Sequence, residues 1–293
     1  IQSSSNMKSA LLSFLLLITF SFQAQNEKAF VIYNSKGKKV SYKKLKKAML
    51  QKEFVFFGEH HDNPISHWLQ LELLKDLHTK NGENLRIGLE MFEQDQQVLL
   101  NDYMLGTISD KQFKDSARLW PNYQTDYQPI LMYAKENKLF CLASNVPRKF
   151  ASLLFKKGRA GLKELSENDK AFICPIDFPV DSTLSQYNAL IEMGQHMGGS
   201  GINFMEAQAL KDATMAHFML LNRVEGNVYY HLNGSYHSDY HQGIIWYIQQ
   251  KLPEAQIGTI STVTQENISK LDKEHFGKAD FIICVPESMT RTH

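Results

Sequence analysis

The sequence predicts an α/β fold, in which a mainly parallel central sheet is flanked by helices and carries an inserted helical lid subdomain. Short apolar runs rich in β-forming residues alternate with helical segments, which is the pattern of parallel strands joined by crossover helices. Each apolar run leads directly into a polar motif, as strands do where ligands bind to open α/β sheets. The composition, 43% hydrophobic and 22% charged, is that of a globular chain.

The strands are predicted from the apolar runs and the helices from the amphipathic segments between them. We expect strands over 29–33, 53–57, 85–89, 139–143, 228–232, 256–263 and 280–285. Helices are expected near 42–50, from Pro64 with Asn63 as its cap, over 94–105, 109–117, 126–137, 148–157 and 204–222, and near 242–250. Residues 174–203 contain several prolines and glycines and predict a loop or mobile lid. The expectation is one domain over 25–293 with a helical lid at about 92–223.

The first 24 residues are predicted to be a signal peptide. Met7 and Lys8 precede an apolar run over 10–22 that ends near Ala24, which is the layout of a secretory leader. We therefore expect a bacterial protein exported to the periplasm or cell surface, with a membrane anchor as the alternative. No cysteine lies near the leader, so no lipid attachment is expected there. A net charge of +1 provides no basic field for nucleic acid.

Titratable side chains follow four of the predicted strands. Glu59 and His61 follow the first central strand, Glu90 ends the next, and Arg148 and His237 follow two others. Because the carboxyl ends of parallel strands meet at one edge of the sheet, these groups are expected to share a cleft. Carboxylates and imidazoles suit general acid–base catalysis or a divalent metal, and the two histidines and two glutamates are the candidates for either role.

The predicted helix over 204–222 carries two polar residues on an otherwise apolar surface. Gln208 and Asp212 lie one turn apart and share a face. Burying them is costly unless they are hydrogen-bonded, so they predict either a contact between helices or a ligand-binding face. His60 and His61 are neighbours in an extended segment, so only one of them is expected to enter the cleft.

Five motifs in order resemble the ChaN-like haem-binding family, which shares a superfamily with erythromycin-esterase-like and Tiki/TraB-like proteins. They are Gly58-Glu59-x-His61-Asp62-Asn63, Gly88-Leu89-Glu90-Met91-Phe92, Asn145-Val146-Pro147-Arg148, Ala207-Gln208 with Asp212-Ala213-Thr214-Met215-Ala216, and Gly234-x-x-His237. Trp120, Tyr123 and Tyr127 are similar to the helical insert of that family. Two features depart from it: the chain has no lipobox cysteine, and Lys211 stands where the family usually has tryptophan.

The resemblance implies an exported haem-binding protein of haem or iron acquisition. Haem would lie between the α/β core and the lid, a homodimer could form around cofacial haems, and an outer-membrane haem receptor would be a partner. An iron porphyrin needs an apolar slot, an axial ligand and cations for its propionates. The candidate axial ligands are Tyr123, Tyr127, Tyr236, His196 and His237, and Arg148 is the candidate cation.

The resemblance to the wider superfamily implies an alternative activity. In this alternative, Glu59, His61, Glu90 and His237 would make the protein a hydrolase, with or without a metal. One carboxylate would activate water while a histidine carries the proton. The sequence contains neither H-E-x-x-H nor G-x-S-x-G, so the zinc-protease and serine-hydrolase routes are not indicated. The two functions are compatible if haem binds away from the cleft.

Overall fold

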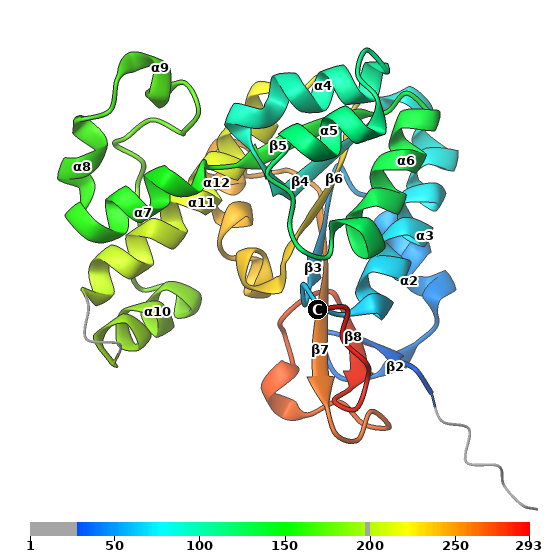
Figure 1. Cartoon of the computed structure of the whole chain (residues 1–293). Coiled ribbons are helices and arrows are strands. Elements are labelled where there is room, and N and C mark those ends of the chain that lie inside the picture. Colours follow the sequence, from blue (N-terminus) through cyan, green and yellow to red (C-terminus); the bar gives the residue numbers. More distant parts are fainter. Residues whose placement is uncertain (1–27, 197–199) are drawn as a thin grey trace, which may run out of the picture.

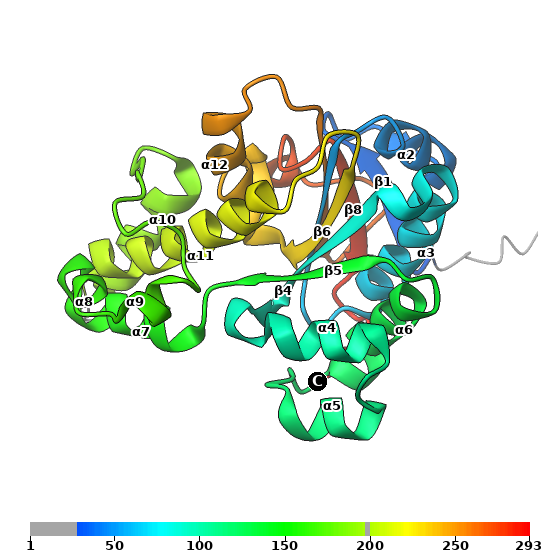
Figure 2. The same ribbon diagram turned by 90° about the horizontal axis from the view of Figure 1, so that it is seen from above.

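The protein is a three-layer α/β/α structure with one mixed sheet between two layers of helices (Figures 1 and 2). The computed structural model describes residues 28–196 and 200–293, so the predicted leader lies outside the described residues. Among the helices that are described, none is long and apolar enough to cross a membrane.

The sheet has eight strands in the order β2-β1-β8-β7-β3-β6-β4-β5. Their bounds are β1 (Val31–Asn34), β2 (Lys39–Val40), β3 (Phe54–Glu59), β4 (Leu85–Glu93), β5 (Phe140–Asn145), β6 (Val228–Gly234), β7 (Ile257–Gln265) and β8 (Phe281–Pro286). Neighbours from β8 to β5 are parallel, and β1 is antiparallel to both β8 and β2. The predicted mainly parallel α/β fold is therefore confirmed.

The helices cover both faces of this sheet. They are α2 (Tyr42–Met49), α3 (Pro64–Asn81), α4 (Gln97–Leu105), α5 (Asp110–Ser116), α6 (Gln128–Glu136), α7 (Arg148–Lys157), α8 (Arg159–Lys163), α9 (Glu167–Lys170), α10 (Ser185–His196), α11 (Gly201–Leu221) and α12 (Ile244–Lys251). Alternate residues of a strand point to opposite faces. Accordingly Val55 and Phe57 pack with the layer of α2 to α6, whereas Phe54 and Phe56 pack with the layer of α7 to α12.

The region over 92–223, which the sequence predicts to be a helical lid, is mostly helical. β5 divides it, so that α4 to α6 lie on one face and α7 to α11 on the other (Figure 2). The loop predicted over 174–203 is wrong for 185–196, which form α10, and its residues 197–199 lie outside the described residues. Tyr187, Leu190 and Gly194 lie on one buried face of this helix. The glycine allows α11 to approach closely, since a Cβ on Gly194 would lie 2.8 Å from Cα of Gly201.

Candidate functional site

The carboxyl ends of β3, β6 and β4 lie side by side and carry the candidate site. Glu59 is paired in register with Gly234, and Leu89, which precedes Glu90, is paired with Leu232. The two glutamates therefore flank the end of β6. The backbone N–H of Gly234 donates to Oε2 of Glu90 at 2.6 Å. The glycine also leaves room for an imidazole, because a Cβ there would lie 2.9 Å from Nε2 of His61.

Glu59 is a buried carboxylate at the centre of a hydrogen-bonded cluster. It accepts from Nδ1 of His61 at 2.9 Å, from Nε2 of Gln70 at 2.5 Å and from the hydroxyl of Tyr127 at 2.5 Å. Burial alone would favour the neutral acid. The nearby rings of His67 and His61 and the Tyr127 hydroxyl outweigh burial and hold the pKa of Glu59 below its usual value. Glu59 is therefore charged at neutral pH.

His61 presents its second ring nitrogen to the cavity. Because Nδ1 is held by Glu59, Nε2 faces Gly234, and it has no hydrogen-bond partner among the described residues. The His61 ring packs edge-on against Trp120 with the two ring centroids 4.7 Å apart, and 40% of the His61 side chain is exposed. Burial would lower the pKa of His61, but the hydrogen bond that its Nδ1–H donates to Glu59 and the charge of Glu90 raise it overall. This is an imidazole arranged to take up and release a proton at Nε2.

A second cluster joins Glu90, His237 and Asp212. Nε2 of His237 lies 3.2 Å from Oε1 of Glu90, and Nδ1 is hydrogen-bonded to Asp212. The hydroxyl of Tyr187 donates to the other oxygen of Asp212 at 2.8 Å. Burial would lower the pKa of His237, but the two carboxylates raise it to about 10, so the imidazole is charged. Both of its nitrogens are engaged, so it is not free to bind a ligand.

A polar cavity of about 420 Å³ opens above these groups. Its walls are Glu59, His60, His61, Asp62, Gly234, Ser235, Tyr236, His237 and His293. The last residues of the chain lie across its rim: Arg291 pairs with Asp62 at 3.0 Å, and the hydroxyl of Thr292 donates to Asp126 at 2.6 Å. The predicted convergence of Glu59, His61, Glu90 and His237 is therefore what the structure shows, and we call this cavity the cleft.

Arg148 does not join the cleft, contrary to expectation. Its side chain is exposed at the first residue of α7 and makes no hydrogen bond or ion pair within the described part of the chain. The chain leaves the sheet at Asn145, whose amide donates to the carbonyl of Glu90 at 3.1 Å, and the turn through Pro147 then carries Arg148 away.

The tyrosines and the other histidine proposed as haem ligands have different surroundings. Tyr123 is buried among Phe92 and Phe113, and Tyr127 donates to Glu59. Tyr236 lines the cleft, but its hydroxyl donates to the carbonyl of Gln186 at 2.5 Å. His196 is exposed at the end of α10.

The remaining predicted residues and the missed ones belong to the two clusters. Gln208 lies against His237, with its Nε2 3.1 Å from Nδ1 of the ring, and Asp212 is the hydrogen-bond partner of the same ring. Tyr187 and Gln70 were missed; Tyr187 lies in the segment predicted as a loop, and Gln70 resembles any polar residue of α3. Within 28–196 and 200–293, no three His, Cys, Asp or Glu side chains are grouped to hold a metal ion, and the metal role stays a prediction.

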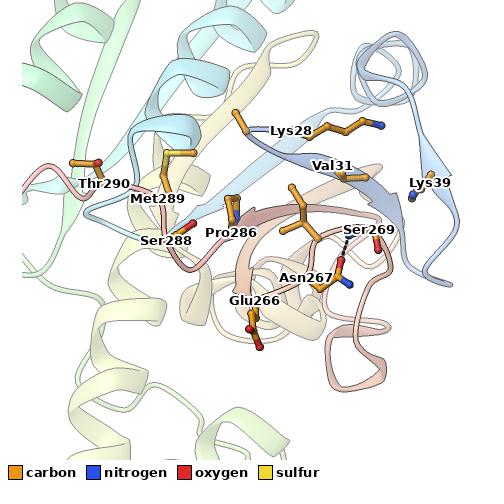
Figure 3. A pocket seen from close by; sticks show the side chains of 12 residues that line it. Lys28, Val31, Lys39, Glu266, Asn267, Ser269, Pro286, Ser288, Met289 and Thr290 are labelled. Atoms are coloured by element: carbon orange, nitrogen blue, oxygen red, sulfur yellow. Dashed lines mark hydrogen bonds between the residues drawn. The ribbon is translucent and has the colours of Figure 1, made fainter. Parts of the chain in front are cut away.

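Of the several hollows away from the cleft, one adjoins β1 and β8 and another adjoins α11 and α12. One, of about 1160 Å³, lies beside β1 and β8 and is bordered by Lys28, Lys39 and Glu266 (Figure 3). The other, of about 410 Å³, lies between the second half of α11, α12 and the segment 174–179. We call it the α11–α12 groove. Its walls are Cys174, Pro175, Asp177, Phe178, Pro179, Ala213, Ala216, His217, Leu220, Tyr247 and Lys251.

Comparison with known proteins places the chain in a family. The model of a family described as "Haem-binding uptake, Tiki superfamily, ChaN" matches residues 45–248. The chain is similar to ChaN of Campylobacter jejuni, whose structure is described as binding haem cofacially, with 19% identity and a TM-score of 0.66 over 88% of this chain and 97% of that one. A protein of Bacillus cereus has 11% identity and a TM-score of 0.51 over 84% of this chain and 92% of its own.

A curated plant relative is similar over a shorter stretch. "Protein RETICULATA-RELATED 5, chloroplastic" of Arabidopsis thaliana is 27% identical over 128 residues, which are 42% of this chain and 17% of the plant protein. The family model, in contrast, spans more than half of the chain, and the resemblance inferred from the five motifs is confirmed. The chain belongs to the ChaN haem-binding uptake family of the Tiki superfamily.

Proposed function

We propose that this protein binds haem and serves in haem or iron acquisition outside the cytoplasm. The observation that carries the proposal is the family match over residues 45–248. The leader predicted over 1–24 supports export to the periplasm or cell surface. The cofacial haem described for the Campylobacter protein supports a homodimer around paired haems. An outer-membrane haem receptor as partner is what the family resemblance implies.

The residues that line a hollow determine whether a porphyrin can bind there. Haem needs an apolar slot for its ring and a free donor for its iron. The cleft is lined mainly by acids, imidazoles and hydroxyls; carboxylates engage both ring nitrogens of His237, whereas Nε2 of His61 has no partner among the described residues. The α11–α12 groove has walls of proline, alanine, leucine and phenylalanine. Each hollow borders an imidazole, His61 in the cleft and His217 in the groove, and the groove also borders Asp177 and Lys251.

The experiment is a titration of the apo-protein, without residues 1–24, with hemin. A saturable, shifted Soret band with a defined stoichiometry is the expected result. Light scattering after size exclusion, with and without hemin, tests the dimer. A Soret band that grows linearly and stays at the position of free hemin contradicts haem binding.

The cleft supports a second function, hydrolysis by general acid–base catalysis. Glu59 fixes the Nδ1–H tautomer of His61, so Nε2 can remove a proton from a water molecule in the cavity. His237 also lines the cavity, where Glu90 and Asp212 hold both of its ring nitrogens. The Glu59–His61 pair that faces an open cavity is the observation that favours this function.

A panel of nitrophenyl esters and lactones tests the second function. We expect turnover that falls at low pH, as His61 becomes protonated, and that is lost in His61→Gln. Activity equal to that of the His61→Gln variant across the panel contradicts hydrolysis in the cleft. Because the hemin titration and the ester assay are separate measurements, each tests one of the two functions without depending on the other.

A further inference from the structure

His67 is a buried histidine that contacts both members of the Glu59–His61 pair. It lies in the first half of α3 and is 5% exposed, and Gln70 shares its face of the helix. Nδ1 of His67 lies 3.6 Å from Oε2 of Glu59, and Nε2 lies 3.0 Å from the backbone carbonyl oxygen of His61. The ring does not border the cleft itself. His67 can therefore affect a ligand in the cleft only through the two residues that it contacts.

Within the described residues, the polar partners of both ring nitrogens of His67 are acceptors. The amide of Gln70 directs its Nε2 to the ionised carboxylate of Glu59 and its Oε1 to Nδ1 of His67, at 3.1 Å. Nε2 of His67 faces the carbonyl of His61 and also Oδ2 of Asp126, at 3.5 Å. A neutral imidazole has a single N–H, so one of its nitrogens would lie unpaired against a buried oxygen, at a cost of about 1–3 kcal/mol. Both nitrogens therefore donate, and the ring is a cation.

The charge of His67 lies between two buried carboxylates, which are those of Glu59 and Asp126. Burial raises the pKa of Glu59, and the charge of His67 is the largest of the effects that lower it. Oδ2 of Asp126 is held in turn by the amide of Asn122 and the hydroxyl of Thr292, both at 2.6 Å. The imidazolium thus has a fixed partner on each side, and it stabilises the charged form of Glu59.

His67 also fixes the position of His61 from the backbone side. The carbonyl oxygen of His61 accepts from Nε2 of His67 and from Nδ2 of Asn122, the latter at 2.6 Å. Asn122 precedes the π-helical turn η3 (Tyr123–Tyr127), and π-helical turns are frequent at functional sites. The last residue of this turn, Tyr127, packs edge-on against the His67 ring with the ring centroids 5.0 Å apart. Two donors and a packed aromatic ring therefore hold this part of the cleft wall in one arrangement.

We propose that His67 is a positioning residue of the cleft, a buried imidazolium that holds Glu59 ionised and orients Glu59 and His61 for proton transfer. This inference deepens the proposed hydrolytic function and rests on it for the effect on turnover. The two clusters of the site then share one plan, an imidazolium between two buried carboxylates: His67 between Glu59 and Asp126, and His237 between Glu90 and Asp212.

The first test measures the protonation of His67 in the unchanged chain. After sequential assignment, nitrogen-detected NMR of the imidazole rings at pH 7 should show a proton on both nitrogens of His67. His217 is the internal reference, because burial lowers its pKa and one of its nitrogens then lacks a proton. One unprotonated nitrogen on His67 would overturn the inference. The measurement needs neither a substrate nor a variant, so it decides the charge of His67 even if every substitution impairs folding.

The second test measures the effect of that charge on Glu59. Carbon-detected NMR of the carboxyl groups gives the pKa of Glu59 in the unchanged chain and in two variants. His67→Gln removes the charge and keeps a side chain that can donate a hydrogen bond, so the pKa of Glu59 should rise. His78→Gln is the matched control on α3, since Nδ1 of His78 lies 2.9 Å from the hydroxyl of Tyr133, and it should leave this pKa unchanged. The same pKa in all three chains contradicts the proposed role.

The third test separates a positioning role from a structural one by steady-state kinetics. With an ester that the unchanged chain hydrolyses, kcat of His67→Gln should fall by at least about tenfold. KM should change less than twofold, because His67 does not border the cleft. His78→Gln should keep both constants, and circular dichroism checks the fold of each variant. An unchanged kcat in folded His67→Gln overturns the positioning role.

The outcomes distinguish this inference from the function on which it rests. If the unchanged chain hydrolyses no ester or lactone of the panel, hydrolysis in the cleft is wrong, and the two NMR tests still decide whether His67 is charged and holds Glu59 ionised. If the chain does hydrolyse a member of the panel but His67 carries a single proton, hydrolysis stands and the role of His67 is wrong.

Discussion

The cleft and the α11–α12 groove use the two halves of one helix in opposite ways. The first half of α11 contributes Gln208 and Asp212 to the cleft, where acids and imidazoles are held by one another. The second half contributes His217 and Leu220 to the groove, where the imidazole has no partner in the described part of the chain. A buried charged group requires partners within the protein. A half-exposed neutral imidazole on an apolar wall, in contrast, can remain without a protein partner and is accessible to a ligand from solvent. The difference separates a self-satisfied polar network from a surface suited to an external ligand.

The largest expected effect is on stability, in Asp212→Ala. This change leaves Nδ1–H of His237 and the hydroxyl of Tyr187 without an acceptor in buried positions, and each such group costs about 1–3 kcal/mol. His217→Ala, little more than one turn further along α11, should change the free energy of unfolding by less than about 1 kcal/mol. Urea unfolding measures both. Equal costs for the two variants would contradict the contrast between cleft and groove.

The second prediction uses the pH dependence of the same ion pairs. The pKa of His237 is about 10 in the folded protein and 6.5 in the unfolded chain. Because the folded value is the higher one, the stabilisation is fully present below pH 6.5 and is lost as the pH rises toward 10. At 1.36 kcal/mol per pKa unit, the free energy of unfolding should fall by several kcal/mol in this range.

Urea unfolding at pH 6, 7, 8 and 9 measures this slope. The three buried cysteines, whose pKa values are raised to about 12, add to the slope near pH 9, so the share of His237 is the difference between the unchanged chain and His237→Gln. His237→Gln should flatten the curve, while His217→Ala should keep the slope of the unchanged chain. A slope that survives His237→Gln would assign the pH dependence to other groups.

The sequence was sufficient to predict the cleft because its groups lie directly at strand ends. Glu59, Glu90 and His237 each come within three residues of an apolar strand, and parallel strands bring such positions to one edge. Arg148 is also three residues beyond its strand, but the turn through Pro147 sets its direction, and no local pattern encodes that direction. Distance along the chain from a strand end was therefore not sufficient by itself.

Long-range packing explains the residues that were missed. Tyr187 supports Asp212 from a helix whose flanking prolines and glycines predict a loop. The groove depends on α12 and on the segment 174–179, which are distant from α11 in the sequence. From the sequence alone, His217 is one polar residue on an apolar helix, and nothing nearby shows that a hollow lies beside it.

A third prediction sharpens the description of the cleft as a proton-transfer site. In Glu59→Gln the neutral amide can no longer stabilise the charged ring, so the pKa of His61 should fall. Nitrogen-detected NMR of the imidazole rings, across pH 5 to 9, measures this pKa and the tautomer. The tautomer should change as well, since Glu59 fixes the proton on Nδ1. His217 is the internal control, and its titration should not move.

The smallest effects are expected at the rim of the cleft, where exposure weakens each contact. Thr292→Val removes a hydrogen bond to the buried carboxylate of Asp126 and should cost about 1–2 kcal/mol. Arg291→Ala removes an ion pair in which the arginine is 68% exposed and should cost less than about 1 kcal/mol. Added salt should weaken the Arg291 contact and leave that of Thr292 nearly unchanged. If Arg291→Ala lowered the free energy of unfolding as much as Asp212→Ala does, Arg291 would be coupled to the buried network. The distinction between the interior of the cleft and its exposed rim would then be wrong.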